Sequence, residues 1–362
     1  MPKDARARAL TWLAVVALGA VAGRLYAQLA YAAAPADVMS TLPGVRAGVL
    51  IAGVSAAFEL FVAPGAIGRW LRARPFLGAL ALRVLIHTAI VVAGLTLNRV
   101  LSAWLIGRYL RDSFTAPEFL QDVVFAFLVT AAALFVLQMR ALIGGRTLLN
   151  VILGRYHRPV REERIFVFMD LVKSTPLAER LGAERYHSFI AAVFRELDGA
   201  VTRSGGEIYA YLGDGVISSW PLSTPDRNAA AVEAVFATAD RLRARSDWFR
   251  ARFQATPTIR ASLHGGAVVA GECGDSRRQI AYLGDALNVA ARLEALSKTL
   301  DAAFLVSGPM LARIALPAGV VATDRGAHRL KGVAAPMPVA ALERPPAPQS
   351  GGTAPGAAQP SS

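Results

Sequence analysis

Residues 205–215 read Gly-Gly-Glu-Ile-Tyr-Ala-Tyr-Leu-Gly-Asp-Gly. The paired glycines end a preceding helical pattern, and the run after them predicts a short strand over Glu207–Leu212. A second run, Gly215–Trp220, follows after only Gly213 and Asp214. A connection of two residues joins antiparallel neighbours in one sheet. Asp214 is therefore expected at a tight turn between two adjacent strands.

The sequence on either side of these strands predicts an α+β domain. Upstream, Arg164–Asp170 is typical of a buried strand, and Glu184–Arg203 carries apolar residues at helical spacing. Ser174 and Thr175 offer caps for a short helix between them. Downstream we expect a helix over Asp226–Arg252, strands over Ile259–His264, Ala267–Gly271 and Ile280–Leu283, and a helix over Ala286–Leu296. Elements in this order form a sheet layered by helices.

Two aspartates are predicted to stand at strand ends. Asp170 ends the buried strand, and Asp214 lies in the turn. Carboxylates at the ends of neighbouring strands can converge on one point, which suits hard divalent cations. Two such cations clamping a triphosphate would activate an attacking hydroxyl and stabilise leaving pyrophosphate. The backbone N–H groups after Asp170 could bind phosphate at a helix start. Taken singly, either aspartate would more simply be a turn or cap residue.

Three stretches together resemble the class III adenylate/guanylate cyclase domain in order and spacing. They are residues 168–175 (Phe-Met-Asp-Leu-Val-Lys-Ser-Thr), residues 205–215, and residues 283–293 (Leu-Gly-Asp-Ala-Leu-Asn-Val-Ala-Ala-Arg-Leu). The resemblance covers roughly Ile165–Leu342, about half of the chain. It implies a ferredoxin-like α+β catalytic domain, placed at residues 164–343, with nucleotidyl cyclase activity.

The resemblance implies roles for four residues. Asp170 and Asp214 match the ligands of two divalent metal ions, Mg²⁺ or Mn²⁺. Asn288 and Arg292 match the transition-state pair, in which the Asn orients the ribose and the Arg contacts the α-phosphate. Residues four apart share one face of a helix, so the spacing of this pair agrees with a joint role.

The resemblance also implies a set of phosphate-binding residues: Leu171, Val172, Lys173, Ser174, Thr175, Arg260 and Lys331. A positive charge at Arg260 or Lys331 would offset the charge of the triphosphate. Single Arg and Lys residues are common on protein surfaces. It therefore stays open whether these two are ordinary solvated residues.

The purine-reading positions depart from the family pattern. The family has a Lys and a small polar or acidic residue where this chain has Ala210 and Ala281. Alanine side chains cannot hydrogen-bond a base, which leaves backbone groups, Tyr209, Tyr211 or Gln279 as readers. ATP is expected rather than GTP, because the guanine-reading Glu and Cys are both absent. The alternatives are a guanylate cyclase, a weak or inactive cyclase-like nucleotide sensor, and a membrane receptor or carrier with a dimerising cytoplasmic domain.

The family builds each active site from two catalytic domains. One supplies the metal aspartates, and the other supplies the helix with the Asn and the Arg. A chain with a single catalytic domain therefore implies a homodimer with two composite sites. Membrane helices in each protomer would hold the pair at high local concentration.

Residues 1–140 are predicted to form an α-helical membrane bundle. Four stretches approach the roughly 20 apolar residues that cross a bilayer: Leu10–Ala33, Ala47–Ala66, Phe76–Leu97 and Phe119–Met139. A cleaved signal peptide is the alternative for the first stretch. Arg and Lys residues cluster before the first, between the second and third, and after the fourth stretch. This pattern predicts a multi-pass protein of the cell (inner) membrane whose catalytic domain lies in the cytoplasm.

The net charge of +13 comes from 39 Lys and Arg against 26 Asp and Glu. Most basic residues flank the predicted spans, which indicates membrane lipid as their partner, and none form a stripe with interleaved aromatics. Nucleic-acid binding is therefore not expected. Arg24, Glu59, Arg83 and His87 fall inside or near the spans. They indicate a sensing or ligand pocket, a structural Glu59–Arg83 pair, or simple snorkelling.

The remaining segments connect or end these domains. Residues 141–163 are predicted to be an amphipathic linker helix, and residues 344–362, rich in Pro, Gly, Ala and Ser, a disordered tail. Cys273 is the single cysteine, which excludes an internal disulfide and a cysteine-based metal cluster. The expected architecture is a helical membrane bundle followed by an α+β cyclase domain.

Overall fold

The computed structural model describes residues 2–30, 38–63, 65–72, 74–106, 116–143, 154–275 and 279–345. The chain divides into two compact units, Met1–Leu142 and Ile143–Ser362. Most of the predicted linker helix (residues 144–153) and nearly all of the predicted tail (residues 346–362) lie outside the described residues.

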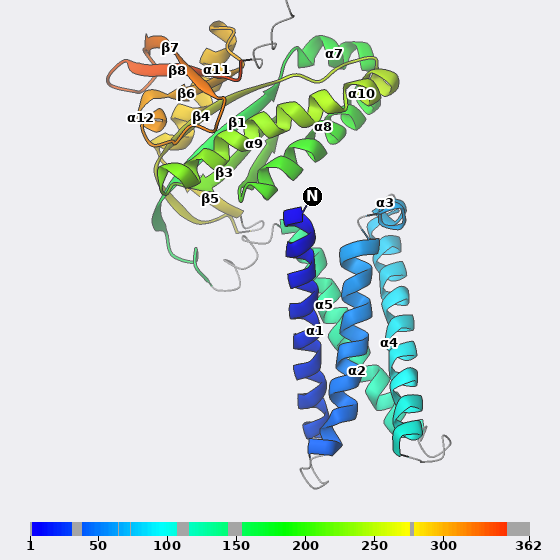
Figure 1. Ribbon diagram of the computed structural model, residues 1–362. Coiled ribbons are helices and arrows are strands. Elements are labelled where there is room, and N and C mark those ends of the chain that lie inside the picture. Colours follow the sequence, from blue (N-terminus) through cyan, green and yellow to red (C-terminus); the bar gives the residue numbers. More distant parts are fainter. Residues whose placement is uncertain are drawn as a thin grey trace, which may run out of the picture. The chain divides into compact units, whose positions relative to one another are not determined.

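The first unit consists of helices, as its apolar sequence predicted (Figure 1). They are α1 (Pro2–Ala30), α2 (Val38–Ala57), the π-helix η1 (Phe58–Val62), α3 (Ala66–Arg72), α4 (Phe76–Ile106) and α5 (Ala116–Ile143). Four helical stretches are long and apolar enough to cross a membrane: Ala9–Leu29, Thr41–Val62, Gly78–Leu105 and Phe119–Val136. They overlap the four predicted spans, apart from residues 31–33, which lie outside the described part.

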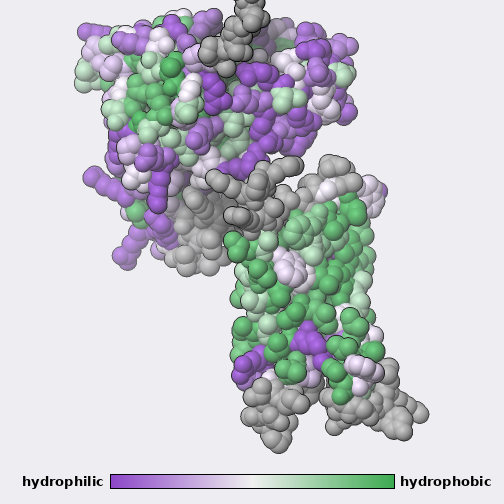
Figure 2. Space-filling view, viewed as in Figure 1, coloured by the Kyte–Doolittle hydropathy of each residue, from purple (hydrophilic) through white to green (hydrophobic). Residues whose placement is uncertain are grey.

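Apolar side chains make up most of the face of this unit that Figure 2 shows. Most of the large hydrophobic residues that the structure describes as exposed belong to α1, α2, α4 and α5, for example Leu10, Leu29, Leu85, Trp104 and Phe135. In a soluble bundle a surface this apolar would be unusual. It suits contact with lipid hydrocarbon.

Helices α1 and α2 touch backbone to backbone. Gly19 and Gly23 of α1 face Gly44 and Gly48 of α2. A Cβ on Gly48 would overlap the carbonyl oxygen of Gly19, and one on Gly23 would overlap that of Gly44. Small residues at a spacing of four let helix backbones approach closely in a membrane. We call these four residues the glycine seam.

Charged side chains inside the bundle pair between helices. The carboxylate of Asp122 in α5 lies 2.6 Å from the guanidinium of Arg99 in α4. It also accepts a 2.8 Å hydrogen bond from the hydroxyl of Tyr26 in α1. A carboxylate in an apolar bundle is stabilised by such partners, so Asp122 ties together three helices.

The π-helix places Glu59 opposite His87 rather than opposite Arg83. The Glu59 carboxylate lies 3.8 Å from Nε2 of His87, and Nδ1 of His87 hydrogen-bonds the backbone carbonyl of Arg83 at 2.9 Å. Arg83 and His87 stand one helical turn apart, so the partner of Glu59 depends on the axial register between the helices. The predicted Glu59–Arg83 pair is therefore wrong.

The second unit alternates strands and helices. Its first half contains β1 (Val160–Leu171), α7 (Ser174–Leu181), α8 (Ala183–Arg203), β2 (Glu207–Leu212), β3 (Gly215–Pro221), α9 (Pro225–Ala244) and α10 (Ser246–Phe253). Its second half contains β4 (Ile259–Cys273), β5 (Gln279–Leu283), α11 (Asp285–Thr299), β6 (Phe304–Ser307), α12 (Gly308–Leu311), β7 (Val321–His328) and β8 (Met337–Glu343).

One mixed sheet runs through this unit in the order β2-β3-β1-β4-β6-β8-β7, with β5 paired to β4. Strand β1 is antiparallel to both β3 and β4. The sequence β1-α8-β2-β3-α9-β4, folded with β1 and β3 at the centre, is the ferredoxin-like arrangement. This confirms the predicted fold class.

Helices cover both faces of the sheet. Alternate residues of a strand point to opposite faces, and β1 shows this directly. Ile165, Val167 and Met169 belong to the core under α8 and α9, whereas Phe166 belongs to the core under α11. Asp170 continues the second series, so its side chain lies on the α11 face.

Predicted element boundaries were wrong at three places. Residues 160–163, predicted as the end of the linker helix, belong to β1. Gly265 and Gly266 were expected to separate two strands, but β4 runs through both. A Cβ on Gly265 would lie 2.6 Å from the sulfur of Met310, so this glycine makes room for α12 instead of ending the strand. The long helix predicted downstream of β3 is divided at Arg245 into α9 and α10.

Candidate active site of the second unit

The two aspartates predicted as metal ligands stand at neighbouring strand ends. Met169 of β1 pairs with Val216 of β3, so Asp170 comes beside Gly215. A Cβ on Gly215 would lie 3.5 Å from Oδ1 of Asp170. Asp214 precedes this glycine in the two-residue turn. The tight turn and the missing side chain at Gly215 together bring Asp214 close to Asp170.

Tyr186 of α8 lies against the same group of residues. Burial raises the pKa of the Tyr186 phenol, the charges of Asp214 and Asp170 raise it further, and a hydrogen bond with Ser174 lowers it. Tyr186 therefore lies near both aspartates and contacts the start of α7. From the sequence, Tyr186 was predicted only as part of the apolar face of a helix, so this contact was missed.

A lysine of α11 contacts the first aspartate. Nζ of Lys298 lies 2.9 Å from Oδ2 of Asp170 and 2.8 Å from Oε1 of Glu294. Hydrogen bonds with Glu294 and then Asp170 raise the pKa of Lys298. The lysine is 52% exposed as a side chain, so it keeps its charge beside Asp170 without being enclosed.

The chemistry of these residues fits a divalent cation. The Lys298 ammonium already places a positive charge beside the Asp170 carboxylate, where a cation would bind. In the part of the chain that the structure describes, no group of three or more His, Cys, Asp or Glu residues surrounds a metal position. Two carboxylates leave the other coordination positions to water and to substrate oxygens, which is how Mg²⁺ is commonly held beside phosphates.

The predicted phosphate cradle is shorter than expected. Leu171 still lies in β1, paired with Ile259, and the Val172 amide donates a 2.9 Å hydrogen bond to the Thr258 carbonyl. The prediction that the Val172 amide is available for phosphate is therefore wrong. Helix α7 begins at Ser174 after Lys173, whose φ of 57° turns the chain into the helix. The first N–H groups of a helix lack intrahelical partners, so the amides of residues 173–175 remain candidates.

Arg260 stands directly across from Asp170. The two residues are paired between β4 and β1, and antiparallel partners place their side chains on the same face. Its guanidinium lies 2.7 Å from the carboxylate of Asp301, a side chain that is 92% exposed. A negatively charged partner so open to solvent is readily exchanged for a phosphate.

Asn288, Arg292 and Lys331 form a separate group. Asn288 is exposed on α11 and Arg292 is partly buried. A Cβ on Gly332 would lie 3.3 Å from both terminal nitrogens of Arg292, so Arg292 rests against the turn that carries Lys331. At about 1.5 Å per residue, Asn288 is separated by about 15 Å along α11 from Lys298, which touches Asp170. Asp170 therefore lies beside the last turn of α11, whereas Asn288 lies in its first turn.

One of the positions predicted to read the base, Tyr209, packs against Tyr282 at a third place. The rings of Tyr209 in β2 and Tyr282 in β5 lie 5.0 Å apart, and the Tyr282 amide donates a 3.4 Å hydrogen bond to the Tyr209 hydroxyl. Ala210 and Ala281 are the sequence neighbours of these tyrosines. A shift in register between Ile208 and Ala210 leaves Tyr209 as the extra residue of a bulge, which turns its ring into the core beside β5.

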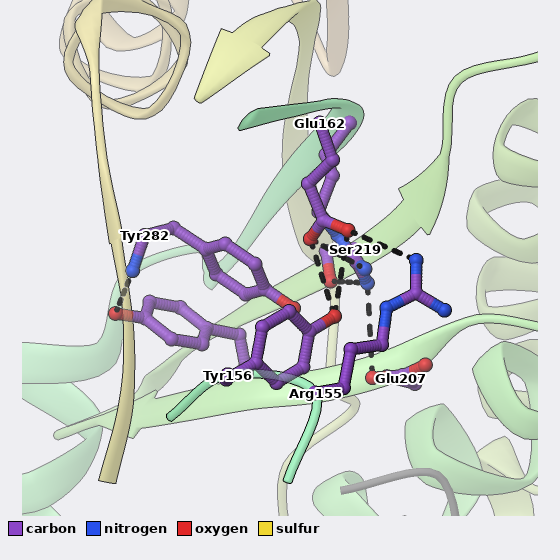
Figure 3. Close-up of polar contacts among 8 residues, drawn as sticks. Arg155, Tyr156, Glu162, Glu207, Ser219 and Tyr282 are labelled. Carbon is purple, nitrogen blue, oxygen red and sulfur yellow. Dashed lines mark hydrogen bonds and ion pairs between the residues drawn. The ribbon is translucent and has the colours of Figure 1, made fainter. Parts of the chain in front are cut away.

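A buried arginine, Arg164, underlies this part of the sheet, and Figure 3 labels its partners Glu162, Ser219 and Glu207. Arg164 is 4% exposed and donates a 2.8 Å hydrogen bond to Ser219. Its guanidinium also lies 3.3 Å from Glu162 and 3.7 Å from Glu207. A buried charge requires such partners, so these four residues fix β1 against β2 and β3.

Two tyrosines extend this network towards the start of the domain. The guanidinium of Arg164 lies 4.7 Å from the ring centroid of Tyr282, and the hydroxyl of Tyr156 lies 3.4 Å from both carboxylate oxygens of Glu162. Tyr156, which precedes β1, is 3% exposed. The network thus connects the entry of the domain with β5, which carries Ala281. The sequence provided no signal for it.

Sequence comparison agrees with this arrangement. The family model described as "Adenylate and Guanylate cyclase catalytic domain" matches residues 159–338, a range that contains every candidate site residue named above. The second unit is a class III cyclase domain. The chain is 38% identical over 213 residues to adenylate cyclase 2 of Rhizobium meliloti (strain 1021), which covers 59% of this chain and 59% of that protein.

Two further relatives support the assignment of the cyclase domain. Adenylate cyclase 1 of the same organism is 29% identical over 156 residues, covering 42% of this chain and 24% of that protein. The structure of a bacterial light-regulated adenylyl cyclase superposes with a TM-score of 0.51 at 22% identity, covering 60% of this chain and 63% of that one. The chain thus matches 59% and 24% of the lengths of the two curated relatives, and the structural likeness shows the fold.

Proposed function

We propose that this protein is a membrane-bound adenylate cyclase, which converts ATP to 3′,5′-cyclic AMP and pyrophosphate at a homodimer interface. The separation of the site residues carries the proposal. Asp170 and Asp214 lie at one end of α11, and Asn288 is displaced from the Asp170 contact by about 15 Å along the helix. One chain therefore presents two half-sites, and a second copy related by a twofold axis would complete both.

Each half-site has its own task in the proposed reaction. Asp170 and Asp214 would hold two divalent cations, Mg²⁺ or Mn²⁺, which when bound lower the pKa of the ribose 3′-hydroxyl and offset the charge of the triphosphate. From the partner chain, Asn288 would orient the ribose and Arg292 would contact the α-phosphate. Holding both reacting groups in line is a large part of catalysis in phosphoryl transfer.

The remaining basic and backbone groups would bind the polyphosphate. Arg260 lies across from Asp170 and belongs to the metal half-site. Lys331 lies beside Arg292 and belongs to the other half-site. The amides of residues 173–175, at the start of α7, add a helix N-terminus, where anions are favoured.

ATP is the proposed substrate. Ala210 and Ala281 lack the hydrogen-bonding groups that would read a guanine edge, and the relatives named above are adenylate cyclases. We place the cyclase domain in the cytoplasm of a cell whose membrane contains the four apolar helices, because Arg and Lys residues cluster on that side of the spans.

The test is cyclic-nucleotide production by full-length protein in detergent or in membranes. ATP or GTP is supplied with Mg²⁺ or Mn²⁺, and wild type is compared with Asp214→Ala. We expect cyclic AMP from ATP with wild type, little cyclic GMP from GTP, and no product with the variant. Equal product from both proteins, or none from either nucleotide, would overturn the proposal; cyclic GMP alone would make the protein a guanylate cyclase.

The second candidate is a nucleotide sensor without turnover, and the two alanines at the base positions favour it. It differs from the first in one measurement. Tight binding of ATP by wild type, combined with no cyclic AMP under any metal condition, would establish the sensor and exclude the enzyme.

A further inference from the structure

We propose that Lys298 is a built-in counter-ion of the metal site, which occupies Asp170 until a divalent cation displaces it. The inference rests on the proposed function and concerns the regulation of that same site. Its observation is the position of one ammonium group, 2.9 Å from Oδ2 of Asp170. That oxygen belongs to one of the two carboxylates available for the metal.

The ion pair between Lys298 and Asp170 holds the Asp170 carboxylate but can be replaced by a divalent cation. Asp170 lies beside Gly215, the residue that follows Asp214, and neighbouring carboxylates repel one another. The Lys298 ammonium relieves this repulsion in the metal-free protein. Because its side chain is 52% exposed, the ion pair is screened by water and contributes little stability. A divalent cation carries twice the charge and binds both carboxylates, so it wins the competition.

Glu294 keeps a contact with Lys298 when the lysine leaves Asp170. Its carboxylate lies 2.8 Å from Nζ of Lys298, four residues earlier on α11. Such pairs form on helix surfaces without other support. Lys298 can therefore leave Asp170 by a small side-chain rotation and keep one ion pair throughout. No backbone movement is needed for the metal site to open.

Lys298 also links the two half-sites of one chain. It stands near the end of the helix that carries Asn288 and Arg292. In the proposed homodimer those two residues serve the partner's metal half-site, whereas Lys298 serves its own chain's. Loading one site with metal thus changes an ion pair on the helix that completes the other site.

The experiment measures metal binding without nucleotide. Full-length protein in detergent is titrated with Mn²⁺, and free Mn²⁺ is followed by electron paramagnetic resonance. Lys298→Met keeps the length of the side chain and removes its charge; Lys298→Gln is a second neutral variant in case the first is poorly folded. We expect the neutral variants to bind Mn²⁺ about two- to five-fold more tightly, the range of an exposed ion pair. Lys298→Arg should stay close to wild type.

A matched control separates the contact from general charge. Arg180→Met removes one positive charge from α7, where the guanidinium contacts the Gln254 carbonyl at 3.3 Å, and should leave Mn²⁺ affinity unchanged. Equal tightening by Arg180→Met would reduce Lys298 to background electrostatics and overturn the proposal.

The outcomes also separate this inference from the proposed function. If Asp170→Asn and Asp214→Asn each bind Mn²⁺ as wild type does, the metal assignment itself is wrong and both proposals fall. If those variants lose Mn²⁺ while Lys298→Met and Lys298→Gln match wild type, the metal site stands and only the counter-ion role is disproved.

Discussion

Asp122 in the membrane helices and Asp170 in the cyclase domain are both carboxylates with a cationic partner, but the partners differ in kind. Asp122 lies 2.6 Å from Arg99, and the two side chains are only 14% and 12% exposed. Asp170 lies 2.9 Å from Lys298, which is half exposed and shared with Glu294. The first pair is enclosed by its own chain, and the second is open to exchange.

This difference shows how charged residues that stabilise the fold can be distinguished from charged residues that are available to a ligand. An enclosed pair resists replacement, because removing one member leaves the other in an apolar environment. An exposed pair contributes little stability, so a carboxylate held in that way is free to serve a ligand.

The largest expected effect is on activity when the two half-sites are damaged separately. Asp214→Ala and Asn288→Ala should each reduce cyclic AMP production by about 100- to 1,000-fold, the usual cost of removing a group that acts in the transition state. Co-expression of the two variants should restore about a quarter of wild-type activity, because about half of the dimers would be mixed and each would hold one intact site. Activity is measured on the total co-expressed protein, and mixed dimers isolated through two different tags should show about half of wild-type activity.

The control for this experiment is co-expression of Asp170→Ala with Asp214→Ala. Both changes damage the same half-site, so mixing cannot rebuild one. Restoration here as well, or no restoration with the first pair, would contradict the composite site and place all functional residues within one chain.

The second-largest expected effect is on stability, and it tests the comparison between Asp122 and Asp170 directly. Asp122→Asn keeps the size of the side chain but removes the charge opposite Arg99, and should lower the free energy of unfolding by about 3 kcal/mol. Asp170→Asn should change it by less than about 1 kcal/mol, because its partner is exposed. Denaturation of both variants in the same detergent gives the two values. Similar losses of unfolding free energy in both variants would contradict the distinction between the enclosed pair of Asp122 and the exposed pair of Asp170.

A buried histidine predicts a smaller, pH-dependent effect. His264 is 8% exposed and hydrogen-bonded to Ser307 at 2.6 Å, and burial lowers its pKa to about 4. Below its ordinary pKa the unfolded chain binds a proton that the folded domain does not. Stability should therefore fall as the pH drops through 6.5 towards 4, by about 2 kcal/mol between pH 7.5 and pH 5.

The measurement is chemical denaturation of wild type and His264→Gln across this range. The variant lacks the titrating group, so its stability should depend less steeply on pH, whatever its value at pH 7.5. Parallel curves for the two proteins would show that other groups account for the acid sensitivity.

The smallest effect concerns Tyr186. Its phenol lies beside Asp214 and Ser174, and its pKa is raised, chiefly by burial, so it stays neutral throughout the physiological range. Tyr186→Phe should reduce kcat by about two- to five-fold through loss of one hydrogen bond, with no change in the pH profile between 7 and 9. A new titration in that interval would mean that the phenol takes part in proton transfer.

The sequence predicted the fold and the location of Asp170, Asp214, Asn288 and Arg292 because each stands in a motif with local spacing. The strand end, the two-residue turn and the helix face are all defined within a few residues. Elements of this kind depend on local propensity and on hydrophobic pattern. The same is true of the apolar helices of the first unit.

Contacts between distant segments could not be predicted in this way. Lys298 follows Glu294 at a spacing typical of a solvated helix pair, and nothing in that pattern points to Asp170, far away in the chain. Arg164 opens an apolar run and looks like a strand end at the surface, yet it is buried by partners from β2 and β3. The Val172 amide could not be predicted for the same reason, since its acceptor, Thr258, lies far away in the chain, just before β4.

The glycine seam between α1 and α2 determines where the membrane unit can change shape. Helices whose backbones touch have no side chains between them to repack, so α1 and α2 are expected to move as one rigid body. The boundary between α2 and α4 is different, because Gly94 there faces the flexible side chain of Ile51. The Arg46 guanidinium of α2 also hydrogen-bonds the side chain of Asn98 in α4 at 2.7 Å. Contacts made by side chains can rearrange, so a change of shape in this unit is expected to displace α4 against the α1–α2 pair.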